Sequence, residues 1–112
     1  MRFAVPVTNG RLAAHFGHCE HFAFIDVDET TKTVVSKELV DSPGHQPGLL
    51  PVWLAEEGVA AVIAGGMGSR AQALFRENRI HVVVGTLGDD PEQIVLDYIQ
   101  GTLATGNNVC DH

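Results

Sequence analysis

The chain has 112 residues, with 14 acidic and seven basic side chains that give a formal net charge of −7 at neutral pH. This length can bury one hydrophobic core without disulfides or a structural metal, and the negative charge disfavours binding to nucleic acid. The longest uninterrupted apolar run covers residues 59–64, which is too short to span a bilayer. Because the N-terminus shows no signal-peptide pattern and only two cysteines are present, we expect a cytoplasmic protein with no membrane partner.

The hydrophobic pattern predicts five strands and three helices in the order βββαβαβα. The strands are expected over residues 2–7, 21–27, 33–40, 59–64 and 80–84. The helices are expected from residue 49 to just before Gly58, from a Ser69 cap through Asn78, and from Pro91 to Gly101. Ahead of the third helix, Asp90 and Gln93 form the pattern of a capping box.

This chain order predicts an α/β fold with one mixed sheet. Strands one, four and five are expected to be parallel, because helices connect them by right-handed crossovers. The hairpin of strands two and three extends the other side of strand one, which gives a five-stranded sheet of order 3-2-1-4-5 with strand two antiparallel. The order resembles the ribonuclease H architecture. However, the first strand, RFAVPV, carries none of the carboxylates that such a nuclease uses, and the chain has no nucleophile elbow.

The predicted topology brings four loops to the carboxyl edge of the sheet. Residues 8–20, 41–48, 65–69 and 85–90 follow strands one, three, four and five. We therefore expect the soft ligands on these loops to converge, namely His15, His18, Cys19, His45 and Met67. The tail over residues 102–112, which we expect to be flexible, can extend roughly 40 Å and bring Cys110 and His112 to the same crevice.

The segment HFGHCEHF, residues 15–22, concentrates imidazole and thiol groups. These groups suit zinc, copper(I) and iron–sulfur species, whereas calcium and magnesium prefer oxygen ligands. His15, His18 and Cys19 would share one face if the loop formed a helical turn. Their spacing matches no closed zinc finger, so an external ligand, a tail residue or a second chain must complete the site. The alternative is that the histidines bond to backbone in turns and that Cys19 is simply buried.

The segment GGMGSRA, residues 65–71, joins the fourth strand to the second helix. Its glycines allow close approach to backbone N–H groups, and a helix N-terminus attracts anions. The pattern is neither a Walker A sequence nor GxGxxG, so an anionic cluster is a better candidate than a nucleotide. The residues expected to hold it are Gly65, Gly66, Met67, Gly68, Ser69 and Arg70. The alternative is tight packing of strand against helix, with Met67 as a core residue.

Three features together resemble the dinitrogenase iron–molybdenum cofactor-binding family. They are HFG at residues 15–17, a Phe-rich strand that ends in Asp26, and GGMGSRA before a helix. The family includes NifX and NafY-type carriers and the C-terminal domain of NifB, and the resemblance runs over essentially all 112 residues as a single domain. It implies a ribonuclease H-like fold used for binding, and a site at His15 and residues 66–68. Many relatives have Arg-Ala after HFG, where this chain has His18 and Cys19, which favours direct ligation of metal.

The leading hypothesis is a NifX-like, non-enzymatic carrier or scaffold for an iron–sulfur or iron–molybdenum type cluster. Zinc can substitute for the cluster in such a ligand set. The expected partners are the metallocluster and a protein that donates or accepts it, and a homodimer stays open. Two alternatives also remain open at this point: a thiol redox protein or sensor that uses Cys19 and Cys110, and a simple zinc-binding interaction module.

Overall fold

β1 (Arg2–Thr8) forms the centre of the sheet, because its apolar run is buried on both faces. The computed structural model describes residues 1–44, 46 and 48–106, and the strand order is β4-β3-β1-β5-β6, with β2 also paired to β1. β3 is antiparallel to β1 and β4, whereas β5 is parallel to β1 and β6. The other strands are β2 Arg11–Leu12, β3 His21–Asp28, β4 Thr33–Asp41, β5 Val59–Ile63 and β6 His81–Val83.

Within the described residues the sheet has six strands, so the expected number of five is wrong. The additional strand, β2, returns along β1 after a tight turn, and Val7 pairs with Leu12. Asn9 and Gly10 in this turn have φ angles of 55° and 79°. Two successive left-handed residues match the twist of a hairpin, and Asn-Gly is the dipeptide that favours them. The sequence pattern had indicated only the end of a strand at this point.

The described part of the chain contains three α-helices: α1 (Leu49–Glu56), α2 (Ser69–Glu77) and α3 (Pro91–Gln100). α3 begins as expected, because the Asp90 carboxylate accepts the Gln93 N–H at 3.2 Å, and it ends at the left-handed Gly101. α2 begins one residue earlier than expected. Gly68 occupies its cap position with extended backbone, so Ser69 is already helical and the prediction of Ser69 as the cap is wrong.

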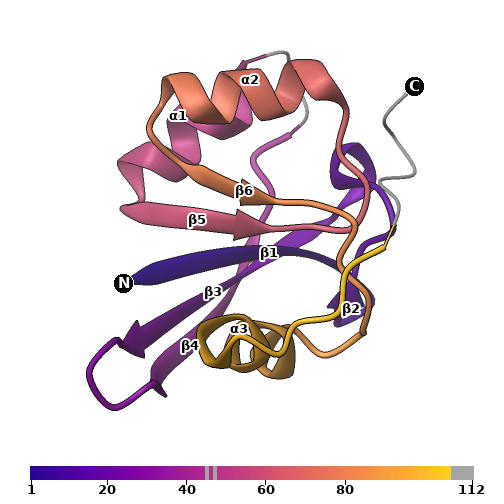
Figure 1. The fold of residues 1–112 in the computed structure, drawn as a ribbon. Helices are drawn as coiled ribbons and strands as arrows, with labels where there is room; N and C mark the ends of the chain where they lie inside the picture. The colour runs from indigo at the N-terminus through magenta and orange to yellow at the C-terminus, as the bar shows by residue number, and fades with distance from the viewer. Residues whose placement is uncertain (45, 47, 107–112) are drawn as a thin grey trace.

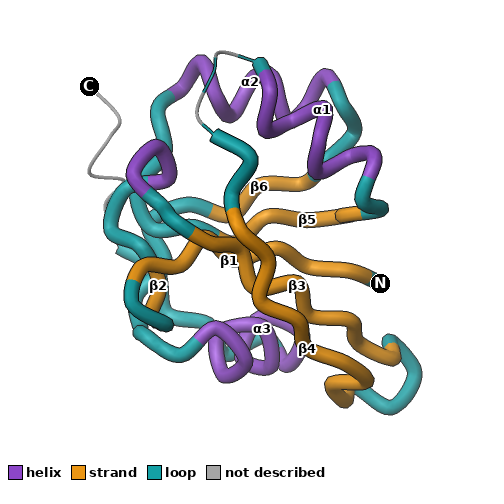
Figure 2. Tube along the Cα trace, turned by 180° about the vertical axis from the view of Figure 1, so that it is seen from behind, coloured by secondary structure: helices purple, strands orange, loops and turns teal. Residues whose placement is uncertain are grey.

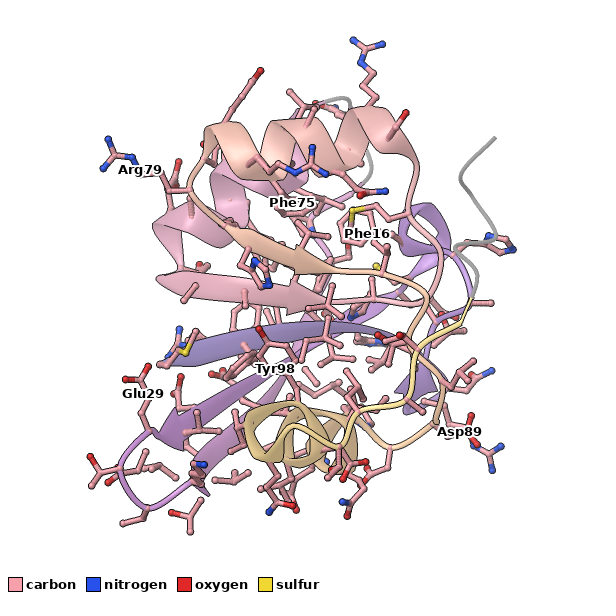
Figure 3. The ribbon with its side chains drawn as sticks, in the orientation of Figure 1. Phe16, Glu29, Phe75, Arg79, Asp89 and Tyr98 are labelled. Carbon is pink, nitrogen blue, oxygen red and sulfur yellow. The ribbon has the colours of Figure 1, made fainter. Side chains whose placement is uncertain are left out.

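The sheet is the middle layer of the fold, with α1 and α2 on one face and α3 on the other (Figure 1). Each face carries its own cluster of buried apolar side chains. On the α1 and α2 face, the rings of Phe16 and Phe75 meet edge to face at 5.3 Å (Figure 3). On the α3 face, Phe3 and Tyr98 meet in the same way at 5.6 Å. Among the described residues, no helix combines the length and apolarity needed to cross a membrane.

Candidate functional site

The loops after β1, β5 and β6 lie together at the carboxyl edge of the sheet (Figures 1 and 2). His15 forms a parallel bridge with Gly66: the Phe16 N–H donates to Gly66 O at 2.8 Å, and the Gly66 N–H donates to Ala14 O at 2.8 Å. The Gly85 N–H in turn donates to Gly65 O at 2.7 Å. The predicted convergence of the HFG and GGMG segments is therefore confirmed at the level of the backbone.

Gly65 allows this close approach. A Cβ atom at residue 65 would lie 3.0 Å from Ala13 O and 3.1 Å from Ala14 O, which is closer than ordinary van der Waals contact. By contrast, a Cβ at Gly17 or Gly68 would meet nothing within 4 Å. The first glycine of GGMG is thus needed to pack one loop against the other.

The HFG segment forms a short 3₁₀ turn over Phe16–His18, and Phe16 anchors it. The Phe16 side chain is 6% exposed, and its ring contacts those of Phe75 and Phe22 at centroid distances of 5.3 and 5.9 Å. His15 precedes the turn in extended conformation and is exposed. The turn therefore holds His15 at the rim of the edge, next to a buried aromatic anchor.

Cys19 lies inside the core and does not line this rim. It follows the 3₁₀ turn with extended backbone and is 2% exposed, in the apolar cluster beneath α1 and α2. Burial raises the pKa of its thiol to about 11, so the thiol is protonated at neutral pH. His15 and Cys19 do not share an exposed face, because His15 is exposed whereas Cys19 is buried. A thiolate is the reactive form, so this environment does not favour the thiol redox alternative.

A groove of about 310 Å³ opens where the HFG turn meets the start of α2, and we call it the α2-side groove. It is lined by Phe16, Gly17, Gln46, Gly48, Leu50, Pro51, Arg70, Ala71 and Leu74. Apolar side chains form most of this surface, and the exposed Arg70 in the first turn of α2 is its basic group among the described residues. The side chain of Met67 is 1% exposed and packs in the core. Its backbone oxygen accepts the Gln72 amide at 2.9 Å.

A second groove, of about 320 Å³, lies toward α3 and is called the α3-side groove. It is lined by Leu12, Ala13, Ala14, Gly65, Gly66, Gly85, Thr86, Leu87, Gly88 and Asp89. Sequence reasoning placed residues 85–90 at this edge without assigning them a role. The available signal was the composition of GTLGDD, which resembles GGMG in placing glycines directly after a strand.

Several of the predicted ligands are not brought together in the part of the chain that the structure describes. There, no three His, Cys, Asp or Glu side chains are placed to hold a metal ion. His45, Cys110 and His112 fall outside the described residues, as does the side chain of His18. The start of the tail does return to the carboxyl edge, because the Leu87 N–H donates to Ala104 O at 2.9 Å and Thr105 bridges to Thr86.

The fold is a mixed α/β sheet with grooves at the carboxyl edge of its parallel strands, where sheets of this class commonly bind ligands. The comparisons with known proteins identify the particular group. The chain belongs to the dinitrogenase iron-molybdenum cofactor family, because the model of that family matches residues 1–101. The matched range includes both the HFG turn and the GGMG loop.

Two relatives and one protein that shares the fold accompany this match. The uncharacterized protein MJ0580 of Methanocaldococcus jannaschii is 30% identical over 108 residues, which cover 92% of this chain and 89% of the relative. The crystal structure of PH0822 superposes with a TM-score of 0.87 at 29% identity, over 96% of each chain. The apo form of the orange protein from Desulfovibrio gigas shares the fold, with a TM-score of 0.70 at 24% identity over 96% of this chain and 93% of that one.

Proposed function

We propose that this chain is a non-enzymatic carrier or scaffold that holds an iron–sulfur or iron–molybdenum type cluster as cargo in the α2-side groove. In this proposal a ribonuclease H-like sheet serves binding in the cytoplasm, and the partner is a protein that donates or accepts the cluster. The family to which the chain belongs supports the class of cargo.

The observation that carries the proposal is the direct pairing of the HFG turn with the GGMG loop. The Phe16 N–H donates to Gly66 O at 2.8 Å, and both segments lead into one groove that is lined by Phe16, Gly17 and Arg70. The pairing sets the HFG turn, which follows the exposed His15, against the loop that leads into α2, whose first turn carries Arg70. These groups come from parts of the chain more than 50 residues apart, so the fold itself assembles the site.

The groups at this site fit an anionic, sulfide-rich cluster. The imidazole of His15 is a ligand for iron, and the cation of Arg70 attracts negative charge. The partial positive charge at the N-terminus of α2 acts in the same direction. The apolar lining from Phe16, Leu50 and Leu74 excludes water around the weakly hydrated sulfides. We therefore propose His15 as the first ligand, with Gly68, Ser69 and Arg70 contacting the anionic surface.

In this proposal Cys19 can reach the cargo only after the Phe16 turn opens, because its thiol is buried and its pKa is raised. The ligand roles of His18, His45, Cys110 and His112 stay predictions. They are consistent with cargo that is held at one exposed residue and completed by ligands from elsewhere in the chain or from a partner.

Anaerobic loading tests the proposal. Protein without an affinity tag is incubated with iron and sulfide, or with tetrathiomolybdate, then desalted and measured by absorption spectroscopy and metal analysis. We expect charge-transfer bands that survive desalting in the wild type, and loss of most of this absorption in His15→Ala. Arg70→Gln should retain the cargo several-fold less well, because it loses only charge attraction.

Matched controls lie at the opposite edge of the sheet. His81 is exposed at the start of β6, and Arg79 lies beyond the end of α2, far from the groove (Figure 3). His81→Ala and Arg79→Gln should load like the wild type. Failure of the wild type to retain any band, or equal retention by His15→Ala and His81→Ala, would rule out this site.

A further inference from the structure

β4 is the outermost strand on one side of the sheet, and no other strand in the described part of the chain pairs with its outer edge (Figure 2). It is nine residues long, whereas β6 at the opposite edge has three. Two of its apolar side chains, Val35 and Leu39, are 68% and 57% exposed. A long edge strand with exposed apolar side chains is a template for pairing with another strand.

A β-bulge limits the regular part of β4. Asp26 pairs with Ser36, whereas the next residue of β3 pairs two positions earlier on β4, so one residue of β4 has no residue opposite it. Beyond the bulge the pairing is regular, and it continues past the end of β4, because the Ser42 N–H donates to Glu20 O at 3.0 Å. The regular ladder therefore runs from Ser36 to Ser42, and Leu39 is its midpoint.

Alternate residues of this ladder direct their backbone groups away from β3. Because the Ser42 N–H points to β3, the alternation of an antiparallel pair directs the N–H and C=O groups of Lys37, Leu39 and Asp41 outward. The side chains of these three residues share one face of the sheet. Leu39 lies opposite Ala23, which belongs to the buried cluster beneath α3, so this is the α3 face. The outer edge thus presents an evenly spaced set of donors, acceptors and side chains.

A second copy of the strand matches this edge when a two-fold axis passes through Leu39. Antiparallel pairing then sets Leu39 against its own copy, and Lys37 of each chain against Asp41 of the other, so that opposite charges meet directly. The Asp41 side chain is 92% exposed although it also pairs with His21 at 3.0 Å, so a second cation can reach it. An axis one residue earlier would set Glu38 against Glu38, and an axis two residues earlier would set Lys37 against Lys37. Like charges directly opposite each other are destabilising, so the charges select the axis at Leu39.

We propose that two copies of this chain associate by antiparallel pairing of their β4 strands about a two-fold axis at Leu39. The two sheets then form one continuous sheet with an isologous interface. Neither groove is lined by a residue between Ser36 and Ser42, so the interface does not use the proposed cluster site. Because one strand from each copy forms the contact, we expect a weak dimer of the smaller interface class, which dissociates on dilution.

Sedimentation velocity at increasing protein concentration, up to that of an NMR sample, tests the proposal. The wild type should change from monomer to dimer over this range. Leu39→Glu should weaken the association by about tenfold or more, because it sets two like charges against each other at the axis. Val35→Glu is the matched control, since Val35 is a more exposed apolar residue of the same strand that precedes the regular ladder, and it should associate like the wild type. A wild type that stays monomeric at every concentration, or equal association of the wild type and Leu39→Glu, overturns the proposal.

A charge exchange tests the register. Lys37→Asp leaves two acidic groups opposite each other, and Asp41→Lys leaves two basic groups, so each variant alone should associate more weakly than the wild type. An equimolar mixture of the two variants should recover the association, because each chain then meets the opposite charge on the other. Within one chain the two positions lie about 13 Å apart along the strand, so recovery reports contact between copies. Thermal unfolding shows that each variant is folded, and a mixture that associates no better than its components overturns the register.

Discussion

Replacement of Gly65 by alanine should separate the HFG turn from the GGMG loop. The added Cβ would lie 3.0 Å from Ala13 O and 3.1 Å from Ala14 O, so these oxygens would have to move by a few tenths of an ångström. They cannot move freely. The Ala13 N–H donates to Pro6 O at 2.9 Å, and Ala14 O accepts the Gly66 N–H at 2.8 Å. The strain is therefore shared between the centre of the sheet and the loop pairing.

The expected loss of stability follows from two opposing terms. Overpacking of a rigid site destabilises the folded state by about 1–3 kcal/mol. Alanine also reduces the conformational entropy of the unfolded chain relative to glycine, which stabilises the folded state by about 0.4–1 kcal/mol. The net loss is about 1–2 kcal/mol, which lowers the melting temperature of a domain of this size by roughly 4–10 °C. Chemical and thermal unfolding, followed by circular dichroism, measures both quantities.

Gly17→Ala is the matched control, because a Cβ there meets nothing within 4 Å and the residue lies in the same turn region. Its stability should stay within about 0.5 kcal/mol of the wild type, as for most open surface positions. Hydrogen exchange adds a local readout, since the Phe16 and Gly66 amides should lose protection only in Gly65→Ala. Wild-type stability and unchanged protection in Gly65→Ala would refute the close-approach argument.

Three further predictions concern groups outside the loop pairing. The Arg2 guanidinium, 2.9 Å from Asp26, lowers the pKa of that carboxyl, so its stabilising effect is present above pH ~3.9 and disappears as the pH falls through the lowered value. Asp26→Asn should thus cost about 0.5–1 kcal/mol in urea unfolding at pH 7 and almost nothing near pH 2; an equal cost at both would contradict the ion pair. In a Cys110→Ser background, Cys19 should react with a thiol reagent at pH 7 only after unfolding, because burial raises its pKa to about 11; immediate stoichiometric labelling of the native protein would show that the thiol is accessible. Phe16→Ala should cost about 3–4 kcal/mol by chemical denaturation, whereas Phe16→Leu should lose clearly less, and similar losses would count against the aromatic anchor.

The sequence was sufficient to locate the main strands, because each is a run of apolar or alternating residues bounded by turn residues. It was also sufficient to predict that His15 lies near Gly66, because strands parallel to β1 must end at the same edge of the sheet. The family resemblance rested on the same segments, and the family match covers residues 1–101. These inferences depend on patterns that extend over many residues, which tertiary packing rarely overrides.

The orientation of individual side chains could not be predicted in the same way. Cys19 is buried in the same cluster as Phe16 and Phe75, whose ring contact joins residues that are far apart in the sequence. β2 consists of two residues, so it offers no periodicity, and the Asn9-Gly10 turn before it had indicated only the end of β1. Thr86 belongs to a loop whose composition marks an edge, whereas the lack of a partner for its hydroxyl among the described residues depends on the positions of all neighbouring atoms.

The GGMGSRA segment was open to two interpretations, anion binding and tight packing, and the structure divides it between them. Gly65 is fixed by contact with Ala13 O and Ala14 O, and Met67 fills the core, so these two residues serve the fold. Gly68 has open space where a side chain would be, and Arg70 is exposed in the α2-side groove. A ligand of this segment would therefore contact its second half, and Gly65→Ala should impair binding only by displacing the loop. Comparison of Gly65→Ala with Arg70→Gln in the loading experiment separates these effects, because only the former should also lower the melting temperature.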